Sequence, residues 1–175
     1  MLNVRHVSAA LLAVAALMVS ASACDSKGPA SPTAVSGPAE CPSTFAFNES
    51  PGLSSTKGGE LVPAGAETAL LCVYPFNTGD NAGVFRLGRT LPATESPDRV
   101  TGYLNGLAEF DPQIKVSCTM MGTDQYQIAL GYPGGTHMIV RVDRNCGKVS
   151  AKGATRRLEH VDTLLALWPR PEATG

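Results

Sequence analysis

The sequence contains few charged residues and few aromatic residues. Only 17% of the residues are charged and the formal net charge is −1, so we expect no strongly basic surface for a nucleic acid. Aromatic residues make up 6% of the chain, and the core is therefore expected to consist mainly of Val, Leu, Ile and Ala. Such a core in a small domain is only marginally stable and benefits from covalent links.

Motifs that would indicate catalysis or a bound metal are also missing. The five cysteines include no C-x-x-C pair, which argues against a zinc site or a thioredoxin-like site. After the first 23 residues the only histidines are His137 and His160, and neither has a second ligand type at metal-binding spacing. Residues 54–57 match S-x-x-K, but glycines follow directly and the companion motifs are missing. Residues 83–90 have the spacing of a phosphate loop, but the Val, Phe and Leu within them indicate a strand. We predict no cofactor and no metal, and we favour a protein that is not an enzyme.

The N-terminal residues have the features of an export signal. Arg5 supplies a positive charge, residues 7–19 are almost all Ala, Val, Leu and Met, and small residues precede Cys24. This order is typical of a secretory signal peptide. The apolar stretch is too short to span a bilayer comfortably as a permanent helix. We therefore predict a signal peptide over residues 1–23.

The residues at the end of this segment resemble the lipobox of bacterial lipoproteins. Ala21, Ser22, Ala23 and Cys24 occupy its four positions, although the family prefers Leu where Ala21 stands. The resemblance implies that Cys24 carries a diacylglycerol and becomes the new N-terminus, and two acyl chains anchor a protein stably. The alternative is ordinary cleavage after Ala23, which leaves Cys24 as a free or paired thiol. We favour lipidation because the cysteine count without Cys24 is even.

The remaining chain divides into a tether, one domain and a short tail. Residues 25–40 are rich in Pro, Ser, Gly and Ala and have few large apolar side chains, so they cannot bury enough surface to fold. We interpret residues 24–40 as the lipidated cysteine with a flexible tether. Residues 41–170 are expected to form a single extracytoplasmic domain, as the length of 175 residues suggests, and residues 171–175 a frayed tail.

Four cysteines lie in the predicted domain, and an even number in an exported protein indicates two disulfides. They are Cys41, Cys72, Cys118 and Cys146. Three connectivities are open to them. We favour Cys41–Cys72, which would fix an irregular N-terminal segment to a buried strand, and Cys118–Cys146, which would join two parts of one strand series. Each closes a loop of roughly 30 residues, which is worth about 3–4 kcal/mol in the chain-entropy model.

Apolar runs and alternating patterns bounded by turn residues predict a series of strands. The predicted strands cover residues 69–74, 84–91, 114–121, 126–132 and 138–142, with a short last strand from Val149. Residues 60–63 are expected to form a short strand or the entry to one. Residues 69–74 are continuously apolar, which is typical of a strand buried on both faces. Turn residues connect the strands at residues 77–83, 122–124, 133–135 and 143–147.

Two helices are predicted between and after these strands. Ser96 can cap the first helix, Pro97 suits its first turn, and the helix should end near Phe110. The second is expected from about Leu158 to Trp168. The basic residues before it, Lys152, Arg156 and Arg157, are interpreted as its solvated start. The predicted fold class is α+β: a small, disulfide-stapled antiparallel sheet with two helices packed on it.

The whole layout resembles that of small exported lipoproteins of actinobacteria, with an Ala-rich signal, a lipobox, a Pro/Ser/Gly tether and a four-cysteine domain. The resemblance implies an address on the extracytoplasmic face of the cell membrane and no particular activity. We favour a non-catalytic binding or interaction module that meets an envelope protein or wall ligand through turns such as residues 77–83 and 133–135. The alternatives are a small exported hydrolase and an inhibitor of exported proteases.

Overall fold

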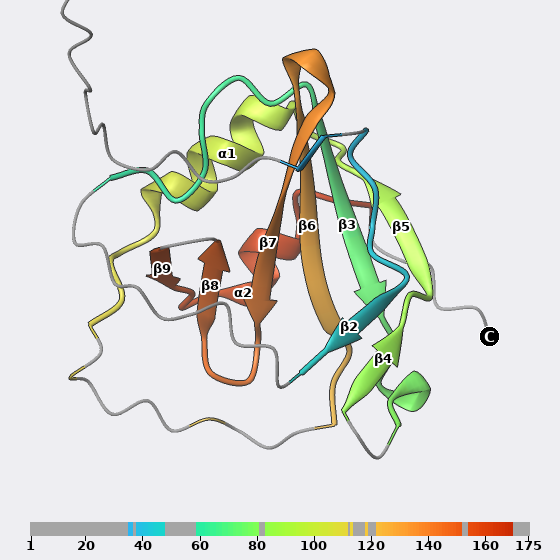
Figure 1. Cartoon of the computed structure of the whole chain (residues 1–175). Coiled ribbons are helices and arrows are strands. Elements are labelled where there is room, and N and C mark those ends of the chain that lie inside the picture. Colours follow the sequence, from blue (N-terminus) through green and yellow to red (C-terminus); the bar gives the residue numbers. More distant parts are fainter. Residues whose placement is uncertain are drawn as a thin grey trace, which may run out of the picture. The chain divides into compact units, whose positions relative to one another are not determined.

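The computed structural model describes residues 35–36, 38–47, 59–80, 83–111, 113, 118, 122–151 and 154–169 (Figure 1). The strands are β1 (Val35–Ser36), β2 (Thr44–Ala46), β3 (Thr68–Tyr74), β4 (Val84–Arg86), β5 (Arg89–Pro92), β6 (Gln125–Tyr132), β7 (Thr136–Asp143), β8 (Lys148–Ala151) and β9 (Ala154–Arg157). The helices are α1 (Pro97–Gly106) and α2 (Val161–Leu165), with 3-10 turns η1 (Phe76–Thr78) and η2 (Pro133–Gly135). Within these described ranges, no helix has the length and apolar character needed to cross a membrane.

The strands form one large antiparallel sheet and one small one. The order in the large sheet is β5-β3-β6-β7-β8-β9, and β1 pairs with the start of β7. Strands β6 to β9 follow one another as a meander, as Figure 1 shows. Strands β2 and β4 form a separate two-stranded ribbon. The predicted antiparallel, disulfide-linked sheet is therefore confirmed, but the α+β label holds only loosely because α1 and α2 are short and the described structure is mostly sheet.

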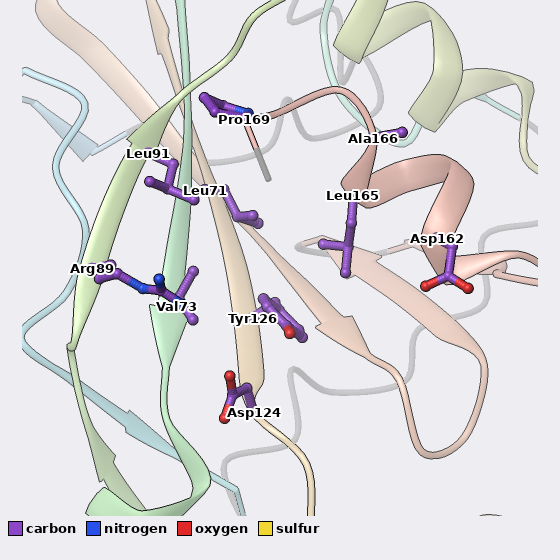
Figure 2. A pocket seen from close by; sticks show the side chains of 10 residues that line it. All are labelled: Leu71, Val73, Arg89, Leu91, Asp124, Tyr126, Asp162, Leu165, Ala166 and Pro169. Atoms are coloured by element: carbon purple, nitrogen blue, oxygen red, sulfur yellow. The ribbon is translucent and has the colours of Figure 1, made fainter. Parts of the chain in front are cut away.

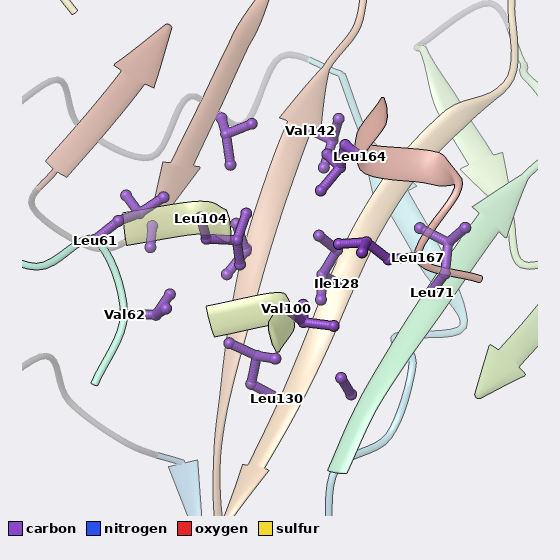
Figure 3. Close-up of a cluster of buried hydrophobic side chains, with 14 of the residues drawn as sticks. Leu61, Val62, Leu71, Val100, Leu104, Ile128, Leu130, Val142, Leu164 and Leu167 are labelled. Atoms are coloured by element: carbon purple, nitrogen blue, oxygen red, sulfur yellow. The ribbon is translucent and has the colours of Figure 1, made fainter. Parts of the chain in front are cut away.

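Strand β3 lies between β5 and β6 in the large sheet and is covered on both faces. Leu71 and Val73 belong to the main core, which includes Leu104 of α1 and Leu164 of α2 (Figure 3). Cys72, the residue between them, belongs to a second cluster that includes aromatic rings of β2 and β4. Successive side chains of a strand point to opposite faces, so helices cover one face of β3 and the ribbon covers the other. This double burial explains why the sequence of β3 is continuously apolar.

Helix α1 begins as predicted and fixes a neighbouring segment. The Ser96 side chain accepts a hydrogen bond from the Arg99 backbone N–H at 3.4 Å, and Pro97 is the first helical residue. The Asn105 side chain holds both the backbone N–H and the carbonyl of Val62, at 3.0 and 2.9 Å. These bonds seat the residue 60–63 segment in the core without making it a strand, so the predicted strand there is wrong.

The predicted strand over residues 84–91 is divided in two. The Leu87 backbone N–H donates to Ser43 in the ribbon, whereas the Gly88 N–H donates to Val73 in the main sheet, both at 2.9 Å. The chain therefore changes sheets at this point. A Cβ on Gly88 would lie 2.6 Å from the Pro75 ring, so this crossing requires glycine.

The C-terminal region also differs from the prediction. Helix α1 ends at Gly106, because the chain then runs along β9, where the Arg157 N–H donates to the Ala108 carbonyl at 2.8 Å. Strand β9 was not predicted, and it contains Arg156 and Arg157, which were interpreted as part of a solvated helix start. Arg156 in β9 is only 4% exposed, and its guanidinium donates to the carbonyls of Gly59 and Thr155. The second helix is correspondingly short and covers only Val161–Leu165.

Two further predictions concern the ends of described segments. The predicted strand over residues 114–121 lies outside the described residues, apart from Cys118. Val35 and Ser36, which lie in the predicted tether, pair with His137 and Thr136 of β7. Ala39 packs against the second cluster, so these residues contact the domain rather than only connecting it to Cys24.

Candidate functional site

A cavity of about 300 Å³ lies between the large sheet and α2 (Figure 2). This volume is at the lower end of the range seen for small-molecule sites, about 300–1,000 Å³. Its walls come from β3, β5, β6 and α2, together with the residues next to β6 and α2. The lining residues are Leu71, Val73, Arg89, Leu91, Asp124, Tyr126, Asp162, Leu165, Ala166 and Pro169.

Strand register places the sheet side of the cavity in two rows. In the first row Leu71 of β3 stands opposite Leu91 of β5, and both are apolar. In the second row Val73 has Arg89 of β5 on one side and Tyr126 of β6 on the other. Residues two apart on a strand share a face, so all five side chains look toward the same side of the sheet. One row is thus apolar, and the next carries a cation and a phenol.

Helix α2 supplies the opposite wall. Leu165 and Ala166, the latter just after the helix, lie three and four residues beyond Asp162, so each is a neighbour of Asp162 on the helix surface. Leu164 is fully buried in the core and holds the helix against the sheet. After the helix, the Thr94 backbone N–H and hydroxyl both donate to the Leu167 carbonyl, at 3.0 and 2.9 Å. The chain that leads to Pro169 is therefore fixed in place.

The cavity has an apolar end and a polar end. Figure 2 shows Leu71, Leu91 and Pro169 toward one end and Asp124 and Tyr126 toward the other. This division follows from the two rows of the sheet, because Asp124 directly precedes β6 and continues the chain away from the apolar row. A ligand that fits this cavity would have an apolar part and a polar part.

The Tyr126 hydroxyl is the centre of the polar end. Burial raises the pKa of Tyr126, and the charge of Asp124 raises it further, while Arg144 and Arg89 partly oppose the shift. The phenol is therefore neutral at pH 7 and can donate a hydrogen bond. Arg144 lies close enough to Tyr126 for its positive charge to lower the pKa of the phenol.

The charged groups at the polar end differ in what they already bind. The Asp124 carboxylate accepts a hydrogen bond from the Phe76 backbone N–H at 3.0 Å, which fixes its direction. The side chains of Arg89 and Asp162 form no hydrogen bond and no ion pair with any other described residue. These two side chains, on opposite walls, are available to a ligand.

The lining residues include few groups that take part directly in catalysis. The carboxylates of Asp124 and Asp162 could act as acid or base, and none of the ten residues is Ser, Thr, Cys, His or Lys. A neutral phenol with a raised pKa is a hydrogen-bond donor at pH 7 and not a base. In the part of the chain that the structure describes, no group of three or more His, Cys, Asp and Glu side chains could hold a metal ion.

The residues singled out in the sequence have mixed outcomes. Cys24 lies outside the described residues, so its lipidation stays a prediction. The favoured pairing is confirmed, because Cys41 bonds to Cys72 and Cys118 bonds to Cys146. Neither disulfide lines the cavity. The Cys118–Cys146 bond does hold the turn that carries Arg144, and the Cys146 N–H donates to Asp143 at 3.0 Å.

The predicted contact turns have defined structures. Residues 77–83 begin within the 3-10 turn η1, and residues 133–135 form η2 with Gly134 and Gly135 at positive φ, which favours glycine. His137 is half-buried in β7 and His160 is an exposed residue just before α2. Neither histidine lines the cavity.

No protein-family model matches this chain, and neither a curated protein nor a solved structure matches it. The function must therefore be argued from the chemistry of the cavity and from the signals in the sequence.

Proposed function

We propose that the chain is a lipoprotein, anchored through Cys24 on the extracytoplasmic face of the cell membrane, whose domain binds a small ligand without transforming it. The observation that carries the binding function is the cavity between the sheet and α2, with its apolar end and its polar end. Pockets that combine an apolar lining with a few placed polar groups are the usual form of small-molecule sites.

The proposed address rests on the sequence and agrees with the cysteines. Ala21 to Cys24 resemble a lipobox, and the layout resembles that of small exported lipoproteins of actinobacteria. Two disulfides within one small domain fit an oxidising compartment outside the cytoplasm. An α+β domain of this kind, with helices on one face of a sheet, is small enough to depend on such links.

Fractionation of cells tests the anchor. Cys24→Ala removes the thiol that would carry the lipid, so the variant should leave the membrane fraction and lose labelling by radioactive palmitate. Ser26→Ala is a matched control next to the lipobox and should behave as the wild type. A Cys24→Ala protein that stays in the membrane fraction and keeps its label would overturn the proposed anchor.

Ligand screening with the purified full-length protein tests the binding function. Ala166 is exposed and lines the cavity, so Ala166→Phe should fill the site without disturbing the core. A ligand that raises the unfolding temperature of the wild type and not of Ala166→Phe would support the proposal. Turnover of a substrate that is lost with Asp124→Asn or Asp162→Asn would instead show an enzyme, such as the hydrolase considered above.

A contact with another protein is the second candidate, and one residue favours it. Phe76 in η1 is 53% exposed, although its backbone is held by Asp124 and its ring lies 6.3 Å from that of Phe85. A large aromatic side chain that is exposed and firmly held is typical of a contact that dominates a protein interface. Phe76→Ala should abolish such a contact and leave the thermal stability nearly unchanged.

A further inference from the structure

We propose that the ligand of this cavity is an apolar amino acid or short apolar peptide, whose ammonium and carboxylate groups both bind at the polar end. The inference rests on the proposed binding function and names the ligand class. Its support comes from the size of the cavity, from its apolar end and from the two kinds of free charge on its walls.

The volume limits the ligand to a small molecule. About 300 Å³ is the lower limit for such sites, so a folded partner or an extended lipid would not be enclosed. Leu71 and Leu91 from the sheet and Leu165 from α2 would surround the apolar side chain of the ligand. Burial of apolar surface contributes roughly 25 cal/mol per Å², so this end gives affinity but little selectivity.

Arg89 is the group that would bind the carboxylate. Its guanidinium has no partner among the described side chains and stands in the row next to the apolar one, one strand from the neutral Tyr126. A guanidinium binds a carboxylate through two parallel hydrogen bonds, and the Tyr126 hydroxyl can add a third donor. The ligand carboxylate would therefore lie beside β5 and β6.

Asp162 is the group that would bind the ammonium. It lies on α2, across the cavity from Arg89, and its carboxylate has no partner among the described residues. Asp124, already oriented by the Phe76 N–H, adds a second negative charge at the same end. The ammonium group has three donors and can be shared between two carboxylates.

The balance of charges selects a ligand that carries both signs. An anion would be repelled by Asp124 and Asp162, and a cation by Arg89 and by Arg144, whose charge acts on Tyr126. A ligand with one charge would also gain an attractive contact with only one of the two walls. A zwitterionic ligand can place an opposite charge beside the charged groups of both walls.

The test compares leucyl-leucine with blocked forms of the same dipeptide. Trp168 is the only tryptophan of the chain, is buried, and directly precedes Pro169 in the cavity wall, so its fluorescence reports occupancy. The full-length protein is titrated with leucyl-leucine, with N-acetyl-leucyl-leucine and with leucyl-leucine amide, and calorimetry checks each result. We expect each blocked form to bind about 10- to 150-fold more weakly, because each loses a charge-assisted hydrogen bond worth about 1.5–3 kcal/mol.

Two single variants test which wall of the cavity binds which charged group of the ligand. In Arg89→Gln the amide should bind as well as the free dipeptide, and in Asp162→Asn the acetylated form should do so. Arg157→Gln and Asp98→Asn are matched controls on exposed residues that do not line the cavity, and they should keep the wild-type preference. Glycyl-glycine, which lacks the apolar part, should not bind measurably.

The outcomes separate this inference from the function on which it rests. If all three dipeptide forms bind equally to the wild type and none binds to Ala166→Phe, the cavity is a binding site but the proposed ligand class is wrong. If blocked and free forms differ equally in wild type, Arg89→Gln and Asp162→Asn, the assignment to these walls is wrong. If nothing in the ligand screen or in this series distinguishes the wild type from Ala166→Phe, the binding function itself is overturned.

Discussion

The two disulfides close loops of similar length but should differ in their contribution to stability. The sequence separations are 31 residues for Cys41–Cys72 and 28 for Cys118–Cys146. In the chain-entropy model both links are worth about 3.6–3.7 kcal/mol at 25 °C. Loop closure therefore predicts nearly equal losses when either pair is replaced by alanine.

The burial of the cysteines makes the two expected losses of stability unequal. Cys72 is fully buried in the second cluster, whereas Cys118 is exposed. Truncation of a buried side chain adds a packing loss, here about 1 kcal/mol for one sulfur atom. We expect Cys41→Ala/Cys72→Ala to lose about 4–5 kcal/mol and Cys118→Ala/Cys146→Ala about 3–4 kcal/mol.

Urea unfolding of the two double variants, followed by circular dichroism, measures the difference. The variants should also unfold with a larger dependence on urea, because their unfolded chains are less compact. An equal or larger loss in Cys118→Ala/Cys146→Ala would refute the argument from burial. Losses below about 1 kcal/mol in both would refute the loop-entropy argument itself.

Two further substitutions test the packing of the core and the raised pKa of Tyr132. Leu104→Ala removes a fully buried side chain of α1 and should cost about 2–5 kcal/mol in urea unfolding, whereas Glu159→Ala, on an exposed residue, should change stability by less than about 0.5 kcal/mol. Burial raises the pKa of Tyr132 to about 12, so the folded state favours its protonated form and stability should fall as the pH rises from about 10 toward 12. Tyr132→Phe also loses the bond to the Pro63 carbonyl, so it should be less stable than the wild type at pH 8 and should lose less stability between pH 10 and 12 in thermal unfolding; a parallel decline would contradict this.

Local patterns predicted the elements whose neighbours in sequence are also neighbours in space. The β6–β7–β8 meander and the start of α1 were found because alternation, turn glycines and the Ser96 cap all act over a few residues. The favoured pairing of the four cysteines followed from the predicted strands, because one link fixes an irregular segment to a buried strand and the other joins two parts of one strand series. These features needed no knowledge of distant contacts.

The wrong predictions concern segments whose structure depends on contacts with residues far away in the sequence. Arg156 is polar in sequence, but carbonyls of Gly59 and Thr155 satisfy its guanidinium, so β9 can bury it. The change of sheet at Gly88 is equally invisible, because one glycine between two apolar segments does not show that they pair with different strands. The pattern of apolar and polar residues indicates which face of a strand is buried, and not which strand lies beside it.

The cavity was missed for the same reason. Its charged groups, Arg89, Asp124 and Asp162, are far apart in the sequence and belong to no motif. From the sequence alone, Leu71 and Val73 are interpreted only as core residues of a buried strand. Only the order β5-β3-β6, with α2 laid against it, brings these side chains around one space.

The pairing of β1 with β7 shortens the segment that connects the domain to Cys24. If Cys24 carries the proposed lipid, the chain from there to Val35 can span at most roughly 40 Å when fully extended. In that case the pairing of Val35 with His137 would keep the start of β7 within about one bilayer thickness of the membrane surface. If the proposed binding function is correct as well, the domain would meet molecules that enter or leave through its own membrane before those dispersed farther out in the envelope.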